Sequence, residues 1–174
     1  MIDLSHMGCQ NVKSLACSTC KIASCGYDYF KTPVSFEDAL KKKLNADYLT
    51  ADREQDMYFL KRWEDGSCIY FDRNFRSCSL PTQQRPTSCL VYPVRLRREC
   101  DDIRMLLNIK CPSAYAMADA LIADDPSVIK YIATAALLFE EDSSYADYVM
   151  SKTIEFKVML DVGSYYDWVE RSIV

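Results

Sequence analysis

The chain has 174 residues, of which 49% are apolar and 26% are charged, and its formal net charge is −4. This composition is typical of a folded globular protein and excludes an intrinsically disordered chain. The acidic balance argues against a nucleic-acid-binding surface as the main function. No window approaches the roughly 18 uninterrupted apolar residues of a membrane-spanning helix.

The N-terminal stretch MIDLSHMGCQNVKSL has neither the basic nor the apolar region of a secretory signal. We therefore expect a cytoplasmic, reducing compartment, in which disulfide bonds rarely persist. The chain holds nine cysteines, an odd number that full pairing cannot accommodate. A disulfide-bonded interaction module stays open as an alternative, but the pattern favours cysteines that act as ligands.

The first cysteine cluster, ACSTCKIASCG, contains Cys17, Cys20 and Cys25. A Cys-x-x-Cys spacing lets two thiolates on one turn point at the same metal ion. The same spacing occurs in redox-active dithiols, but those follow a hydrophobic strand of a βαβ unit, and VKSLACSTC offers none. The cluster therefore favours metal ligation over thiol–disulfide chemistry.

Two elements are expected directly after this cluster. Ser35, with Asp38 three residues later, resembles a capping box and predicts a short helix over FEDALKKKLN. Aromatic-rich runs on either side of an Asp-Gly predict a hairpin over residues 57–72, with its turn at Glu64 to Gly66.

The middle of the chain is expected to be less regular. Cys68 falls at the start of the hairpin's second strand, and the prolines within residues 73–93 predict irregular structure or short strands. The basic run at residues 95–98 is followed at once by acids, a pattern more typical of a solvated face than of a phosphate site. Residues 102–109 predict a further strand.

The C-terminal segment contains no cysteine and is helical by pattern. Helices are expected over residues 113–123, 126–139, 143–160 and 164–174. These expectations together indicate an α+β fold of short strands and loops with a C-terminal helical segment. We divide it into a cysteine-rich metal- or cluster-binding domain at residues 1–112 and a helical extension at 113–174 packed on it.

A second group of cysteines, formed by Cys68, Cys78, Cys89 and Cys111, is too widely spaced to chelate as one local loop. These thiols have to converge through the fold. All-thiolate coordination is typical of zinc or of an iron–sulfur cluster, and the spacing does not separate the two. Cys100 lies among charged residues and is expected to be a free thiol.

The segment GSCIYFDRNFRSCSLPTQQRPTSCLVYPVRL resembles the second half of the CxxCxxCC cysteine-cluster family, whose domains are associated with zinc or iron chelation. The family pattern has a Gly-x-Cys, a second Cys, an Arg-Pro, a third Cys and an aromatic-Pro pair. The matching positions here are Gly66, Cys68, Cys78, Arg85–Pro86, Cys89 and Tyr92–Pro93. Cys111–Pro112 resembles the family's closing Cys-Pro-Gly, and the whole resemblance covers about residues 15–115.

This resemblance implies a protein that holds a 4Fe-4S iron–sulfur cluster or zinc, in a structural or an electron-transfer role. The implied metal ligands are Cys17, Cys20, Cys25, Cys68, Cys78, Cys89 and Cys111, with Cys9 in place of a thiolate that the family has and this first cluster lacks. Arg85 has two interpretations. Its guanidinium donates to the ligating sulfurs and so helps to bind the cofactor, or Arg85–Pro86 is a turn that aims Cys89.

The resemblance extends to flagellin lysine N-methylases, which share this cysteine-rich domain and are associated with an iron–sulfur cluster. It therefore implies an alternative function, a component of a protein N-methyltransferase with a protein partner or a protein substrate. The chain has only four glycines and no glycine-rich loop of the kind that binds S-adenosylmethionine. Whether the protein is an enzyme is left open, and no catalytic residue is assigned.

Overall fold

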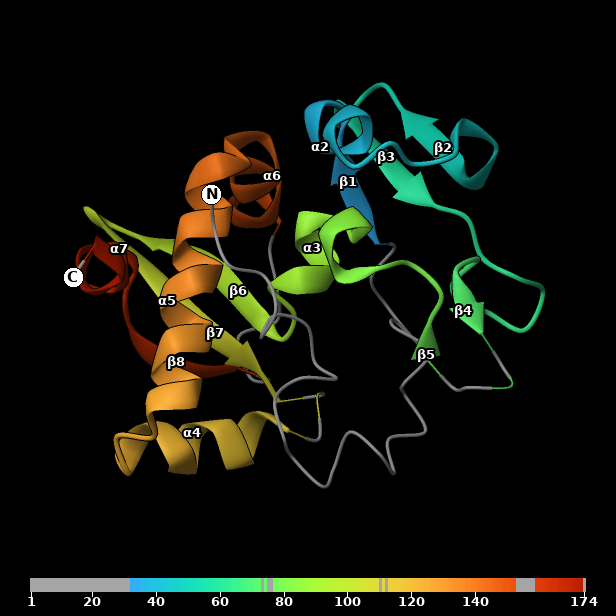
Figure 1. Ribbon diagram of the computed structural model, residues 1–174. Helices are drawn as coiled ribbons and strands as arrows, with labels where there is room; N and C mark the ends of the chain where they lie inside the picture. Colours follow the sequence, from blue (N-terminus) through green and yellow to red (C-terminus); the bar gives the residue numbers. More distant parts are fainter. Residues whose placement is uncertain are drawn as a thin grey trace.

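The computed structural model describes residues 32–72, 74, 77–109, 111, 113–152 and 159–173. Its fold is α+β, as expected, with helices packed around small antiparallel sheets (Figure 1). Among the described helices, none has both the length and the apolar character that a membrane-spanning segment requires.

The first sheet has the strand order β1-β3-β2, all antiparallel. Its strands are β1 (Pro33–Ser35), β2 (Leu49–Asp52) and β3 (Met57–Leu60), and the helix α2 (Phe36–Lys41) follows β1 directly. The Ser35 hydroxyl accepts the backbone N–H of Asp38 at 3.0 Å, so the predicted helix start is confirmed.

The helix α2 ends four residues before the predicted end of FEDALKKKLN. Lys43 has a left-handed backbone with φ of 55°. The N–H groups of Lys43 and Leu44 donate to the carbonyls of Leu40 and Ala39 at 3.1 and 3.0 Å. These two bonds form a Schellman motif, which satisfies the last carbonyls of a helix. Leu44 then packs on the apolar cluster beneath, so burial of Leu44 ends the helix.

The predicted hairpin over residues 57–72 is only partly correct. The turn is present, since Gly66 has φ of 81° and the N–H of Trp63 donates to the carbonyl of Ser67 at 2.9 Å. The returning chain, however, meets the outgoing one in a single bridge, between Arg62 and Cys68. The strand β3 instead pairs along its length with β1 and β2, because those strands let it bury both of its faces.

The proline-rich middle forms short elements, as expected. They are β4 (Phe71–Asp72), β5 (Ser77–Cys78), the 3-10 turn η2 (Thr82–Gln84) and the one-turn helix α3 (Thr87–Leu90). The strands β4 and β5 pair antiparallel, with Phe71 opposite Cys78. The helix α3 was not predicted, because a single turn after Pro86 carries no periodic pattern.

The second large sheet has the order β6-β7-β8, from β6 (Val94–Glu99), β7 (Asp102–Asn108) and β8 (Met159–Ser164). The basic run at residues 95–98 is therefore a strand, in which Arg95 is buried and Arg98 is exposed. Four helices surround this sheet: α4 (Ala114–Ile122), α5 (Pro126–Glu141), α6 (Ser143–Ser151) and α7 (Tyr165–Ile173). Pro126 begins α5, as predicted.

The prediction of a helix over residues 143–160 is wrong at its C-terminal end. The helix α6 ends at Ser151, and Met159 already belongs to β8. The strand β8 pairs with the central strand β7, with Leu107 opposite Leu160. The spacing of apolar residues in the sequence cannot reveal this pairing, because the partner strand lies about 50 residues earlier in the chain.

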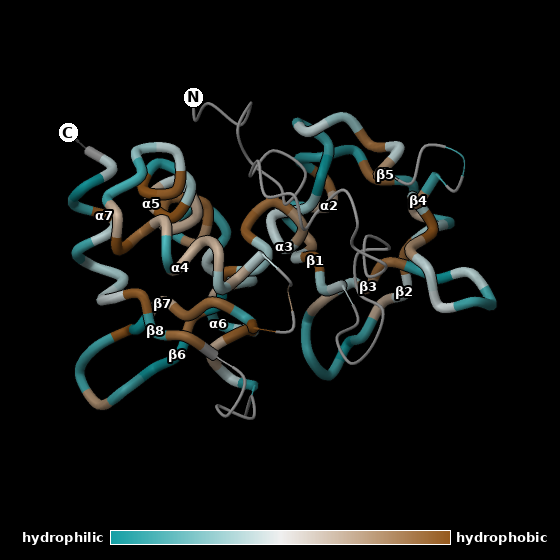
Figure 2. Tube along the Cα trace, turned by 90° about the horizontal axis from the view of Figure 1, so that it is seen from below, coloured by the Kyte–Doolittle hydropathy of each residue, from teal (hydrophilic) through white to brown (hydrophobic). Residues whose placement is uncertain are grey.

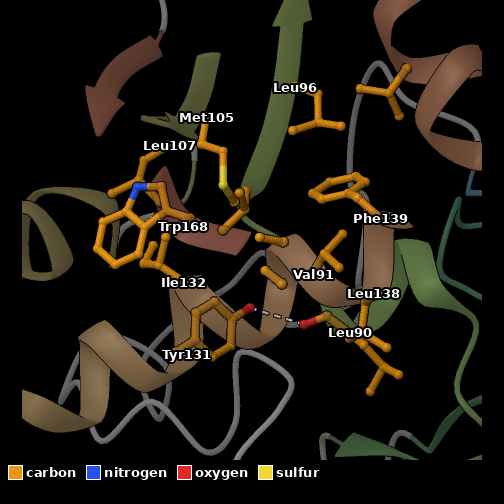
Figure 3. Close-up of a cluster of buried hydrophobic side chains, with 14 of the residues drawn as sticks. Leu90, Val91, Leu96, Met105, Leu107, Tyr131, Ile132, Leu138, Phe139 and Trp168 are labelled. Carbon is orange, nitrogen blue, oxygen red and sulfur yellow. Dashed lines mark hydrogen bonds between the residues drawn. The ribbon is translucent and has the colours of Figure 1, made fainter. Parts of the chain in front are cut away.

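The main core lies between this sheet and α5 (Figure 3). Leu96, Met105 and Leu107 contribute from the sheet, and Ile132 and Phe139 from α5. Figure 2 shows the matching distribution, with apolar stretches along α3, α5 and β7 and hydrophilic stretches on outer loops.

A second, smaller apolar cluster lies under the first sheet. We call it the small cluster; its buried members are Val34, Ala39, Leu60, Cys68 and Tyr70. The helix α3 connects the two, since Leu90 belongs to the main core and Cys89 packs on the small cluster. The Tyr131 hydroxyl of α5 donates to the carbonyl of Leu90 at 3.0 Å (Figure 3), so α3 is held to the main body.

Candidate metal centre

The described residues include five of the nine cysteines. The predicted ligands Cys9, Cys17, Cys20 and Cys25 lie outside the described residues. Of the remaining predicted ligands, Cys68 belongs to the small cluster, and Cys78 and Cys89 pack against it. Cys111 is buried in the main core instead. Three thiols from three separate chain segments therefore share one small apolar environment, and Cys111 belongs to another.

Cys68 and Cys78 are connected by a compact set of backbone bonds around Tyr70. The N–H of Phe71 donates to the carbonyl of Cys68 at 2.9 Å, which closes a tight turn. The carbonyl of Tyr70 accepts both the N–H and the hydroxyl of Ser79, at 2.8 and 2.9 Å. The turn that carries Cys68 is thus bonded to the residue that follows Cys78.

Burial raises the pKa of the Cys68 thiol, because a thiolate loses its hydration there. The backbone N–H of Tyr70 donates to this sulfur and lowers the pKa in part. The neighbouring Cys78 raises it again, and Arg62 lowers it. The Cys78 sulfur therefore lies close enough to influence the ionisation of Cys68. A cation between them would reverse the effect, since it would favour both thiolates.

Tyr70 lies beside this pair of cysteines in the small cluster. Its side chain is 9% exposed, and its hydroxyl accepts the backbone N–H of Asn45 at 3.3 Å. Its ring meets that of Tyr48 edge-on, with centroids 5.3 Å apart. Burial raises the pKa of Tyr70, and Cys68 and Cys78 add to that rise. The backbone of Tyr70 thus bonds both to the Cys68 sulfur and to Ser79, which follows Cys78.

A hydrogen bond from α2 helps to position α3, the short helix that carries Cys89. The Asp38 carboxylate accepts the backbone N–H of Thr87, the first residue of α3, at 2.7 Å. Asp38 is only 5% exposed, and burial raises the pKa of its carboxyl despite this hydrogen bond. The sequence identifies Asp38 as the partner of Ser35. It carries no signal that the carboxylate caps a helix 49 residues later, because such a contact exists only in the tertiary structure.

Arg85 lies at the junction between η2 and α3. Its backbone N–H donates to the carbonyl of Thr82 at 3.1 Å, and its side-chain Nε donates to the carbonyl of Leu80 at 3.1 Å. Pro86 directly precedes α3 as its N-cap, and its carbonyl accepts the N–H of Cys89 at 2.9 Å. This geometry favours the interpretation that Arg85–Pro86 aims Cys89. Donation from Arg85 to a ligating sulfur stays a prediction.

Cys100 occupies the turn between β6 and β7, where it is exposed and has φ of 48°. None of the five described cysteines, Cys68, Cys78, Cys89, Cys100 and Cys111, takes part in a disulfide bond.

The donor set of the small cluster fits a thiophilic metal, since its ligand atoms are sulfurs in a dry environment. It is not complete by itself. Among the described residues, no three His, Cys, Asp or Glu side chains have the arrangement that holds a metal ion. A four-sulfur site would therefore need thiolates from the first cysteine cluster as well as from the small cluster.

Comparison of the chain with protein families, with curated proteins and with solved structures gave no match.

Proposed function

We propose that this protein binds a metal centre ligated by cysteine, either an iron–sulfur cluster or zinc, in a structural or electron-transfer role. The observation that carries the proposal is the gathering of Cys68, Cys78 and Cys89 on one small apolar cluster from three separate segments. Cysteines that serve only as small apolar residues have no need to gather in this way.

The electrostatics of Cys68 support the same proposal. A buried thiol with a raised pKa beside a second thiol is a poor nucleophile, because the thiolate is the reactive form. This argues against a catalytic cysteine at this position. A bound cation supplies the positive charge that stabilises thiolates in a dry site, and the Tyr70 N–H is already directed at one sulfur.

In the proposed site, Cys68, Cys78 and Cys89 provide part of the ligand set, and metal binding has to draw their side chains together, because no three described residues are already arranged around an ion. The rest comes from Cys17, Cys20, Cys25 and Cys9, whose Cys-x-x-Cys spacing suits a second ligating turn. Cys111 is a candidate for a second centre or for a structural thiol, since it belongs to the main core. Tyr70 shields the sulfurs, and Asp38 holds the helix that carries Cys89.

The test is an absorption spectrum and a metal analysis of the full chain purified without oxygen. A brown sample with broad absorption near 400 nm, on the order expected for iron bound by thiolate and sulfide, supports the iron–sulfur form. A colourless sample with about one or two zinc ions per chain supports the zinc form. A folded, metal-free protein would overturn the proposal.

Serine variants sharpen this test. Cys68→Ser and Cys89→Ser should each lose most of the bound metal, because serine is a poor ligand for zinc or iron in an all-sulfur site. Cys100→Ser is the matched control, since Cys100 is exposed on a turn, and it should keep the full metal content. Equal loss in all three variants would contradict the assignment of ligands.

A further inference from the structure

A cavity of about 170 Å³ lies between α4, α5, β8 and α7, and none of Cys68, Cys78 and Cys89 lines it. Its apolar wall consists of Leu121, Ile129, Val162 and the buried indole of Trp168. Asp124, Asp167 and Arg171 line it as well and are exposed. The cavity thus has an apolar wall and a charged rim that is open to solvent.

The apolar wall depends on a β-bulge in β8. Met105 pairs with Gly163 and Leu106 pairs with Asp161, so Val162 is an extra residue without a partner in the ladder. Such a bulge leaves a carbonyl unpaired and turns a side chain in a new direction. Here the carbonyl of Val162 accepts the indole N–H of Trp168 at 3.0 Å.

Gly163 permits this close approach. Its φ is +122°, and a Cβ there would lie 3.2 Å from the indole nitrogen of Trp168. On its other side, Trp168 packs with the main core beside Met105, Leu107 and Ile132 (Figure 3). One part of the cavity wall, the Trp168 indole with the bulged backbone of β8, is therefore fixed by burial and by a hydrogen bond.

The charges on the rim favour a cation. The rim carries two carboxylates, of Asp124 and Asp167, and one guanidinium, that of Arg171. The Arg171 guanidinium lies over the Trp168 ring, 4.8 Å from its centroid. None of the ion pairs formed within the described part of the chain includes Asp124 or Asp167. Both carboxylates are thus available to a ligand, while the guanidinium already has a partner.

We propose that this cavity binds a small organic ammonium ion whose apolar part rests on Leu121, Ile129 and Val162 and whose charge lies between Asp124 and Asp167. The size fits, because an engineered cavity of about 150 Å³ accommodates a benzene ring. A six-membered ring with one aminomethyl group is therefore close to the upper limit. The proposal is independent of the metal centre.

The probe is benzylammonium chloride, added to the full chain labelled with ¹⁵N and followed by amide and indole NMR shifts. We expect saturable shifts at the Gly163 amide and the Trp168 indole, with an affinity in the millimolar range for so small a ligand. Added salt should weaken the binding, since the rim is exposed and its charges are screened. The absence of saturable shifts would overturn the proposal.

Two matched probes test the ligand class. Benzyl alcohol has the same shape without the charge, and it should bind about two- to fivefold more weakly, the range expected for exposed charge pairs. Phenylglycine adds a carboxylate to benzylammonium and should also bind more weakly, because Asp124 and Asp167 repel it. Equal binding of benzyl alcohol, or tighter binding of phenylglycine, would overturn the assignment to cations.

The role of the two rim carboxylates is tested with the double variant Asp124→Asn/Asp167→Asn. It should bind benzylammonium no better than the wild type binds benzyl alcohol. Asp119→Asn removes one exposed carboxylate from α4 outside the cavity and should leave the affinity unchanged. Unchanged binding in the double variant, or an equal loss in the control, would contradict the assigned site.

Discussion

At the scale of single residues, buried polar side chains connect elements that are distant in sequence. Arg95 of β6 is 8% exposed, and its guanidinium donates to the Tyr145 hydroxyl at 2.9 Å. Tyr145 is 1% exposed, and its ring stacks on that of Phe139. Burial raises the pKa of Tyr145 to about 12, although Arg95 lowers it. The neutral phenol therefore joins the sheet to α6 at physiological pH.

Replacement of Tyr145 by phenylalanine should destabilise the protein by about 1–3 kcal/mol, because it leaves a buried N–H of Arg95 without this acceptor. Urea unfolding measures the change. Tyr166→Phe is the control, since Tyr166 is 52% exposed, and its effect should stay within about 0.5 kcal/mol of zero. A Tyr145→Phe variant as stable as the control would show that the contact contributes nothing.

Asp38 is a second such residue, and its pKa is raised by burial. In the folded state it keeps its proton to a higher pH than in the unfolded state. Its contribution to stability is therefore present below the unfolded pKa, near 3.8, and is lost as pH rises through the folded pKa. Relative to Asp38→Asn, the wild type should lose stability across this acidic window.

Asp125 serves as a control of opposite sign in this experiment. Its carboxylate accepts the N–H and the hydroxyl of Ser127, which lowers its pKa. Relative to Asp125→Asn, the wild type should therefore gain stability as pH rises through about 4. Unfolding free energies at a series of pH values measure both slopes, and slopes of the same sign for Asp38 and Asp125 would refute the assignment.

At the scale of elements, the ends of helices are set by tertiary burial. The helices α2 and α4 both end in Schellman motifs, with Lys43 and Asp124 in left-handed conformations of φ 55° and 54°. Lys43 does not favour that conformation, which glycine adopts without strain, whereas aspartate tolerates it better than most residues. A sequence-based boundary therefore misses Lys43, because the usual glycine signal is absent.

Lys43→Gly should stabilise the protein by about 1 kcal/mol, since it removes the strain of a left-handed residue that has a Cβ. Lys42→Gly is the matched control. Lys42 has φ of −84°, so glycine there adds only backbone entropy to the unfolded chain and should destabilise by about 0.5–1 kcal/mol. Thermal unfolding measures both variants. Melting temperatures that shift in the same direction for Lys43→Gly and Lys42→Gly would contradict this account.

At the scale of the whole molecule, two apolar clusters of unequal size share one chain. The main core joins β3 and the β6-β7-β8 sheet to the helices α3 to α7, whereas the small cluster has five buried members among the described residues. Because hydrophobic stabilisation scales with buried apolar area, the small cluster gains less hydrophobic stabilisation than the main core. We therefore expect the proposed metal centre to contribute most of its stabilisation there.

Removal of the metal by chelation should accelerate amide hydrogen exchange in β4 and β5, whose residues Phe71 and Cys78 pack on the small cluster, while β7 stays protected. The reason is that the cysteines Cys68, Cys78 and Cys89 contact the small cluster rather than the main core. Mass spectrometry of exchanged peptides measures both regions in one sample. Uniform acceleration over the whole chain would show that the two clusters unfold as one unit.

The sequence alone determined those features that depend on neighbours along the chain. The cap at Ser35, the start of α5 at Pro126, the strand at residues 102–108 and the turn before Gly66 all follow from local backbone preferences. The cysteine spacing predicts sulfur ligands for a thiophilic metal on similar local grounds, and this stays a prediction.

Only the tertiary structure decided which distant residues meet. It paired β8 with β7 where a longer helix was expected, and it brought the Asp38 carboxylate to the start of α3. It also separated Cys111 from Cys68, Cys78 and Cys89. The physical reason is common to all three. These contacts depend on how apolar surface is shared between elements, and that sharing has no signature in the spacing of residues along the chain.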